Sequence, residues 1–194
     1  MYKFYYHPGI DALRSIIALK ELGQVEAIIL QRLDWDDDFQ GTNCLWWAGV
    51  HQISIAHRLL GYAPEPEIAS VSLHDGLITA ASITLGKTIP VMITISSRHP
   101  VKKEISAAVL CDRGVALLPD AYAGTIFIKK DDHEDEQRSI VTEMQLLLEL
   151  KDFLQYLQNG CRPRCGFDMA VSVSSTICKI RRIANILPTK QFAA

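Results

Sequence analysis

Four side chains in the first third of the sequence could bind or act on a substrate. His51 offers an imidazole, which can exchange a proton near neutral pH. Three tryptophans, Trp35, Trp46 and Trp47, precede it, and an indole face can stack on a sugar ring. Adjacent tryptophans also commonly place one ring in the core and the other at an interface, and the sequence leaves both interpretations of the pair open.

The residues around His51 predict a helix within the stretch 41–61. Its buried face is predicted from spacings of three and four: Leu45, Ala48, Gln52, Ile55, Ala56 and Leu59. Asn43 can cap the start of this helix, and Gly61 stands where a left-handed residue would close it. Since glycine costs about 1 kcal/mol relative to alanine inside a helix, we expect a close neighbour beside Gly49. His51 lies on roughly the opposite flank.

The motif that contains His51 resembles the signature helix of a known enzyme family, the glucose–fructose oxidoreductase and inositol dehydrogenase (Gfo/Idh/MocA) family. The similarity is carried by Ala48-Gly49-Val50-His51 and by Arg58-Leu59-Leu60-Gly61. In that family the helix belongs to the second domain and faces the nicotinamide of a cofactor held by a preceding Rossmann domain. Aligned on His51, Trp47 stands where the family has its catalytic aspartate.

The resemblance spans nearly the whole chain but implies only one of the family's two domains. The family's closing pattern is matched by Glu149, Phe153, Gly160 and Pro163. The sequence has no glycine-rich dinucleotide fingerprint and no Glu-Lys-Pro motif, and without the fingerprint glycines a backbone cannot approach the pyrophosphate. We therefore expect no cofactor to be bound by this chain alone, and NAD(P) only where a Rossmann-domain partner supplies the site.

Position 47 also bears on catalysis. Hydride transfer at a sugar hydroxyl needs a proton donor or acceptor near the carbinol oxygen. In the resembled family a lysine, an aspartate and a histidine supply it, whereas a tryptophan such as Trp47 can donate a hydrogen bond but cannot take a proton. His51 is the one candidate catalytic residue left, and it is either a working site residue or a relic.

Composition predicts a single domain over residues 1–194, because a chain of this length with 48% hydrophobic residues can bury a core. A net charge of −2 disfavours nucleic acid and anionic membranes as partners, and no apolar run approaches the ~20 residues needed to span a bilayer. Five cysteines at irregular spacing fit a reducing cytoplasm. Cys161 and Cys165 have no second pair at zinc spacing, so no metal site is predicted.

Hydrophobic periodicity predicts an α+β fold: a mainly antiparallel, open-faced sheet of about six to eight strands with helices packed on one face. The predicted strands are 2–6, 25–33, 68–74, 77–85, 89–97, 104–111, 115–118 and 125–129, with Asp75-Gly76 as a hairpin turn. The predicted helices are 10–22, the His51 helix, 140–158 and 168–186. The helix over 140–158 is expected to bury a core stripe that includes Leu147, Phe153 and Leu157.

Surface composition gives predictions about partners. Serine and threonine alternate with apolar residues along the sheet, and the resemblance implies a homodimer through this open face. The acidic loop 34–39 could bind a cation or a polyol, or be simply solvated. The charged segment 130–138 is predicted to be solvated surface.

Two functional hypotheses follow. In the first, the chain is a stand-alone substrate-binding and dimerisation domain, not catalytic alone, with a sugar or polyol pocket lined by Trp35, Trp46, Trp47 and His51. In the alternative, it is the substrate half of an NAD(P)-dependent sugar oxidoreductase, completed by a separate or removed Rossmann domain. A free-standing domain should bury the helix within residues 1–23, whereas a severed domain should leave it partly uncovered.

Overall fold

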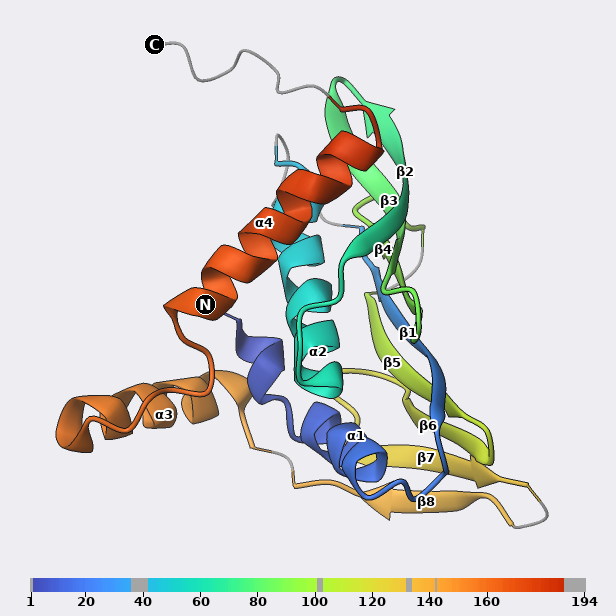
Figure 1. Ribbon diagram of the computed structural model, residues 1–194, viewed down its shortest axis with the longest axis vertical. Helices are drawn as coiled ribbons and strands as arrows, with labels where there is room; N and C mark the ends of the chain where they lie inside the picture. The colour runs from blue at the N-terminus through green and yellow to red at the C-terminus, as the bar shows by residue number, and fades with distance from the viewer. Residues whose placement is uncertain (1, 36–41, 101–102, 132–133, 142, 187–194) are drawn as a thin grey trace.

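The computed structural model describes residues 2–35, 42–100, 103–131, 134–141 and 143–186, which form an eight-stranded sheet with helices beside it (Figure 1). The strands are β1 (Val25–Leu33), β2 (Pro66–His74), β3 (Leu77–Leu85), β4 (Val91–Ser96), β5 (Glu104–Cys111), β6 (Gly114–Leu118), β7 (Thr125–Lys130) and β8 (Glu136–Ser139). The helices are η1 (Lys3–Tyr6, 3-10), α1 (Pro8–Ala18), η2 (Leu45–Gly49, π), α2 (Val50–Leu60), α3 (Gln145–Asn159) and α4 (Phe167–Ile183).

The strands lie in the order β2-β3-β4-β1-β5-β6-β7-β8. β1 pairs in parallel with β4, and the other neighbouring pairs are antiparallel. Asp75 and Gly76 join β2 to β3 with φ angles of 51° and 75°, the conformation that a tight hairpin turn requires. The predicted α+β class, with a mainly antiparallel open sheet, is confirmed.

The core lies between the sheet and the helices α1, α2 and α4, which Figure 1 shows on one side of it. Side chains alternate along a strand, so every second residue of β1 points toward these helices. Ile28 and Leu30 are both 0% exposed. They belong to one apolar cluster with Leu13 of α1, Ile53 of α2 and Ile177 of α4.

The other face of the sheet is more exposed, and the strand register arranges its side chains in rows. The apolar row runs across all eight strands through Ile68, Thr84, Met92, Ile29, Ala108, Leu117, Phe127 and Gln137. The polar row lies two residues further along β1 and consists of Ser70, Ser82, Thr94, Gln31 and Ser106. The open face is therefore part apolar and part hydroxyl-rich.

Two of the predicted segments fold differently. The segment 2–6 contains η1 (Lys3–Tyr6) rather than a strand, because the chain turns into α1 at Pro8 and its backbone bonds locally, with Tyr5 N–H donating to Tyr2 O at 2.8 Å. The segment 130–138, predicted as a charged surface loop, lies at the surface but contains most of β8. There Arg138 bonds both Glu21 and Glu136, so its charges are partly paired across the sheet edge.

The core stripe predicted for the helix over 140–158 is also wrong. Its apolar residues do share one side of α3, but no residue of α3 is buried. Leu147 is 43% exposed, Phe153 50% and Leu157 62%. The periodicity identified the helix correctly, but the described residues supply no apolar surface against its stripe.

Candidate functional site

η2 and α2 together position His51. The Asn43 side chain accepts a hydrogen bond from Leu45 N–H at 3.0 Å, and Gly61 closes α2 with a φ of 77°. Both predicted ends are therefore confirmed, and every residue of the predicted buried face is buried. A Cβ at Gly49 would lie 3.5 Å from Ile95 Cδ1, an ordinary van der Waals distance, so the expected steric need for glycine is wrong.

His51 lies against η1 rather than in an open cleft. Its ring meets the Phe4 ring edge-on, with the centroids 5.2 Å apart. Nδ1 is buried and has no hydrogen-bond partner in the part of the chain that the structure describes. Burial, reinforced by the positive charges of Arg32 and Lys3, lowers the pKa of His51 to about 3. The imidazole is therefore neutral throughout the physiological range.

Arg32 is the neighbour that the sequence did not reveal. It is the last residue of β1 whose side chain points toward the helices, and it is only 6% exposed. Its guanidinium carbon lies 4.7 Å from the centroid of the Trp47 ring and 5.9 Å from that of Phe4, within reach of cation–π attraction. Trp47 is 7% exposed, so the position that the resemblance assigns to a carboxylate holds a buried indole against a cation.

The other two predicted tryptophans lie apart from this cluster. Trp35 is 55% exposed and forms an isolated bridge with Arg98, while Trp46 is 40% exposed. Among the described residues, neither ring contacts His51. The structure thus brings together Trp47 and His51 through Arg32 and Phe4, and it leaves Trp35 and Trp46 at the surface.

The acidic loop is described only at its start. Asp34 is 6% exposed, and one carboxylate oxygen lies 3.2 Å from Lys103 Nζ. This carboxylate is thus paired with a cation. Residues 36–41, on which the rest of the predicted cation or polyol site falls, lie outside the described residues.

This arrangement limits the chemistry available at His51. A group with a pKa of about 3 is not protonated near pH 7, so it cannot act as a general acid there, and it is a weak base. Its neighbours Arg32 and Lys3 are cations, which cannot accept the proton that an aspartate would take. The Phe4 and Trp47 rings are both buried, so this cluster packs as part of the core and exposes no ring face on which a ligand could stack.

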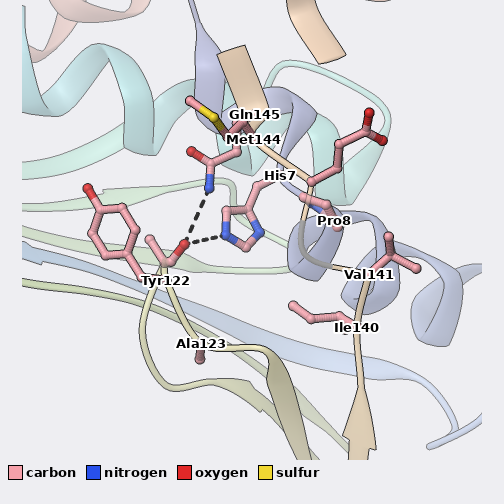
Figure 2. A pocket seen from close by; sticks show the side chains of 10 residues that line it. His7, Pro8, Tyr122, Ala123, Ile140, Val141, Met144 and Gln145 are labelled. Atoms are coloured by element: carbon pink, nitrogen blue, oxygen red, sulfur yellow. Dashed lines mark hydrogen bonds between the residues drawn. The ribbon is translucent and has the colours of Figure 1, made fainter. Parts of the chain in front are cut away.

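A pocket of about 170 Å³ lies near the start of α3, and its lining includes Tyr122, Met144 and His7 (Figure 2). His7 Nε2 donates to Ala121 O at 2.6 Å, and Nδ1 accepts from Gly9 N–H at 2.9 Å. Burial lowers the pKa of His7. With both ring nitrogens engaged, His7 is a structural cap of α1 rather than a binding group.

The hydroxyl-rich part of the open face forms a groove of about 470 Å³. Its lining includes Ser70, Ser82 and Thr94 of the polar row together with Ser96 and His99. None of the four residues predicted from the sequence belongs to this lining. Hydroxyl groups able to bond a polyol therefore gather on the sheet, away from His51.

Within the described residues, no cluster of three His, Cys, Asp or Glu side chains could hold a metal ion. The same part of the chain has no helix with the length and apolar character needed to cross a membrane.

The sequence matches no family model and no curated protein. The structure matches the 3-ketoreductase KijD10 from Actinomadura kijaniata, solved with TDP-benzene and NADP, at a TM-score of 0.81 and 16% identity, over 93% of this chain and 59% of that one. It also matches UDP-N-acetylglucosamine 3-dehydrogenase GnnA from Acidithiobacillus ferrooxidans, at 0.79 and 16% identity, over 95% and 60% of the two chains.

An oxidoreductase from Sinorhizobium meliloti gives the same picture, with a TM-score of 0.79, 10% identity, and coverage of 95% of this chain and 61% of its own. The matched region is the part of these enzymes outside the Rossmann domain. The chain has the fold of the C-terminal part of Gfo/Idh/MocA-type oxidoreductases. It spans about 60% of the length of the solved chains that it matches.

Proposed function

We propose that this chain is a binding and dimerisation domain with the fold of an oxidoreductase substrate domain, and that it is not catalytic on its own. The observation that carries the proposal is the pairing of buried Trp47 with Arg32 beside a neutral His51. In the resembled family a carboxylate at position 47 would share proton transfer with the histidine. Here an indole and a guanidinium occupy that space, and neither accepts a proton.

The open sheet face supports the dimerisation part of the proposal. In the apolar row, Ile29 and Met92 are each 39% exposed, Phe127 38% and Ile68 65%. The row also contains Thr84 on β3 and Gln137 on β8, but its apolar members lie on the other six strands and favour burial against another surface. A second copy related by a two-fold axis presents the same row and can cover it.

A sugar or polyol is the proposed ligand class. The exposed indole rings of Trp35 and Trp46 could stack on a sugar ring, whereas the ring of Trp47 is buried. One of the structurally similar enzymes is a dehydrogenase of UDP-N-acetylglucosamine, which supports this class.

A second candidate function is the substrate half of an NAD(P)-dependent sugar oxidoreductase, completed by a Rossmann domain. It is favoured by the coverage of 59–61% of the similar enzymes, one of which was solved with NADP. The N-terminal helix favours the first candidate instead. In α1, the residues Ile10, Leu13 and Ile16 are at most 1% exposed, as expected of a domain that needs no partner at this helix.

The dimer is tested by measuring the mass of the purified chain in solution by light scattering, for the wild type and for Met92→Glu. Met92 lies in the apolar row, so two glutamates facing each other across the two-fold axis should split the sheet-mediated pair. Gln155→Glu adds the same charge on an exposed helix position and should leave the mass unchanged. An unchanged mass for the Met92 variant would contradict a sheet-mediated dimer.

A further inference from the structure

η1 carries a lysine whose charge has no acidic partner among the described residues. The Lys3 ammonium lies 5.1 Å from the centroid of the Phe4 ring and makes no ion pair within that part of the chain. Burial, followed by the positive charges of Lys103 and Arg32, lowers the pKa of Lys3. Burial and like charges both disfavour the charged form, so a bound anion would stabilise this ammonium.

Lys3 is one of three cations that gather around the His51 ring. The Arg32 guanidinium carbon lies 5.9 Å from the centroid of the Phe4 ring, and the His51 ring meets the same ring edge-on. Lys103 comes directly before β5, and its positive charge acts on His51 together with those of Arg32 and Lys3. η1 itself lies between α2 and α3 (Figure 1). Three elements of the fold thus bring positive charge to one place.

The described carboxylates of this region do not balance these cations. Asp34, directly after β1, lies 3.2 Å from Lys103 Nζ. Glu149 of α3 accepts a hydrogen bond from Tyr2 N–H at 3.1 Å. With both carboxylates counted, three cations face two anions in the described part of the chain, and Lys3 is the cation that forms no ion pair there.

His51 adds a hydrogen-bonding group to this cluster without adding charge. A neutral imidazole carries one N–H donor and one acceptor. Neither ring nitrogen of His51 has a hydrogen-bond partner among the described residues. An N–H on Nε2 is therefore available to an oxygen atom bound beside the ring.

We infer that Lys3, Lys103, Arg32 and His51, here called the Lys3 cluster, bind an oxyanion carried by the ligand. The inference rests on the proposed sugar-binding function and narrows its ligand class to acidic sugars. A carboxylate, as in a uronic acid, and a phosphate group offer the same chemistry, since both present negative oxygens to an ammonium and to an N–H. Trp35 follows the segment that pairs with Lys103, so its exposed ring lies at the same end of the sheet.

The experiment follows the side-chain NMR signals of His51 in the full chain while inorganic phosphate is added at pH 7. Ionic strength is held constant with sodium chloride, because salt screens such contacts. The spectrum of His51→Gln assigns the signals. The expected result is a saturable shift of the His51 signals, whereas His57, which faces Met169 at 3.1 Å, should not respond.

Three variants test which charge holds the anion. Lys3→Gln should weaken phosphate binding by about 10-fold, the loss expected of one hydrogen bond to a charged group. Lys3→Arg keeps the charge and should bind phosphate nearly as the wild type does. Lys87→Gln removes a lysine that is 81% exposed at the opposite end of the sheet, and it should change nothing. An unchanged phosphate affinity in Lys3→Gln would overturn the inference.

The aspartates at positions 36–38 lie outside the described residues and are the competing source of negative charge. If their carboxylates filled the Lys3 cluster, added phosphate would leave the His51 signals of the wild type unmoved. That result would also overturn the inference.

Titrations with glucose, glucose 6-phosphate and glucuronate separate the inference from the proposed function. We expect at least one of the two acidic sugars to bind about 10-fold more tightly than glucose, and the tighter one identifies the group as phosphate or carboxylate. Equal affinity for all three would leave a sugar-binding domain and remove the oxyanion site. A response to phosphate with no response to any of the sugars would keep the oxyanion site and remove the sugar ligand.

Discussion

Gln52 is fully buried in α2, yet among the described residues neither its amide nitrogen nor its amide oxygen has a hydrogen-bond partner. It sits among apolar neighbours on the helical face that the spacing predicted. A buried amide without partners carries its full desolvation cost. The residue therefore weakens the fold at the helix that presents His51.

Gln52→Leu should raise the free energy of unfolding by about 1–2 kcal/mol, because it removes two unpaired polar groups from the core. Urea denaturation at pH 7 and fixed protein concentration measures it. The matched control is Gln155→Leu on the exposed side of α3, which should change stability by less than about 0.5 kcal/mol. A loss of stability in the Gln52 variant would mean that its amide has an essential partner.

His57 predicts a pH dependence of stability. It is 6% exposed, and burial lowers its pKa to about 4, below the ~6.5 of an unfolded histidine. The unfolded state therefore binds the proton more readily, so stability is full above about pH 6.5 and falls as the pH drops toward 4. His57→Leu should reduce the loss between pH 7 and pH 5 by about 2 kcal/mol.

Denaturant titrations at the two pH values measure this difference. His74→Gln is the control, because the His74 side chain is 54% exposed, and its pH dependence should match that of the wild type. If the His57 variant loses as much stability as the wild type on acidification, the burial of His57 is not what depresses its protonation.

For single residues, the sequence predicted where His51 and the ends of its helix lie, but not which side chains surround them. His51, its helix and both helix ends followed from spacing and capping chemistry. The contact of Arg32 with Trp47 did not, because a lone arginine within the apolar run 25–33 gives no sign of which face it takes. Long-range pairing of this kind depends on how β1 lies under η2, which only the fold supplies.

At the scale of the elements, η1 is joined to α3 through the side chain of Tyr6. Tyr6 is buried, its hydroxyl donates to Asp152 and accepts a hydrogen bond from Cys165 N–H at 3.2 Å. Burial and the Asp152 carboxylate raise the pKa of Tyr6, so the hydroxyl stays protonated and can donate. This hydroxyl links α3 and the following loop to the body.

Tyr6→Phe should loosen α3 without unfolding the sheet, because it removes one hydroxyl that serves both α3 and the loop. Amide hydrogen exchange in α3 and in residues 160–166 should become about 5- to 30-fold faster, the equivalent of about 1–2 kcal/mol. Exchange in β1 and β5 should stay the same. Tyr62→Phe, at a residue 51% exposed, should alter neither region. Unchanged exchange in α3 would show that other contacts hold it.

The elements also show where sequence patterns succeed. β1, β3 and β5 match their predicted bounds, since alternating or continuous apolar runs between glycine turns define a strand well. β8 was missed because its four residues are polar and gain their place only by pairing with β7. The stripe of α3 was predicted correctly as a pattern and wrongly as core, because periodicity does not tell which molecule covers an apolar face.

As a whole, the molecule has a fold that it shares with known oxidoreductases and a site that differs at position 47. The domain matches a 3-ketoreductase and a UDP-N-acetylglucosamine 3-dehydrogenase over about 60% of their length, while position 47 lacks the carboxylate that the resemblance expects. Apolar side chains are exposed on the open sheet and on α3. The function proposed here therefore depends on the chain being unable to hold and use a nicotinamide cofactor by itself.

The measurement that tests this claim most directly is a fluorescence titration of the purified chain with NADPH and with NADH. The similar enzyme KijD10, which was solved with NADP, serves as the positive control under the same conditions. We expect no saturable binding to this chain up to about 1 mM of either nucleotide. Saturable binding in the micromolar range by the chain alone would contradict it.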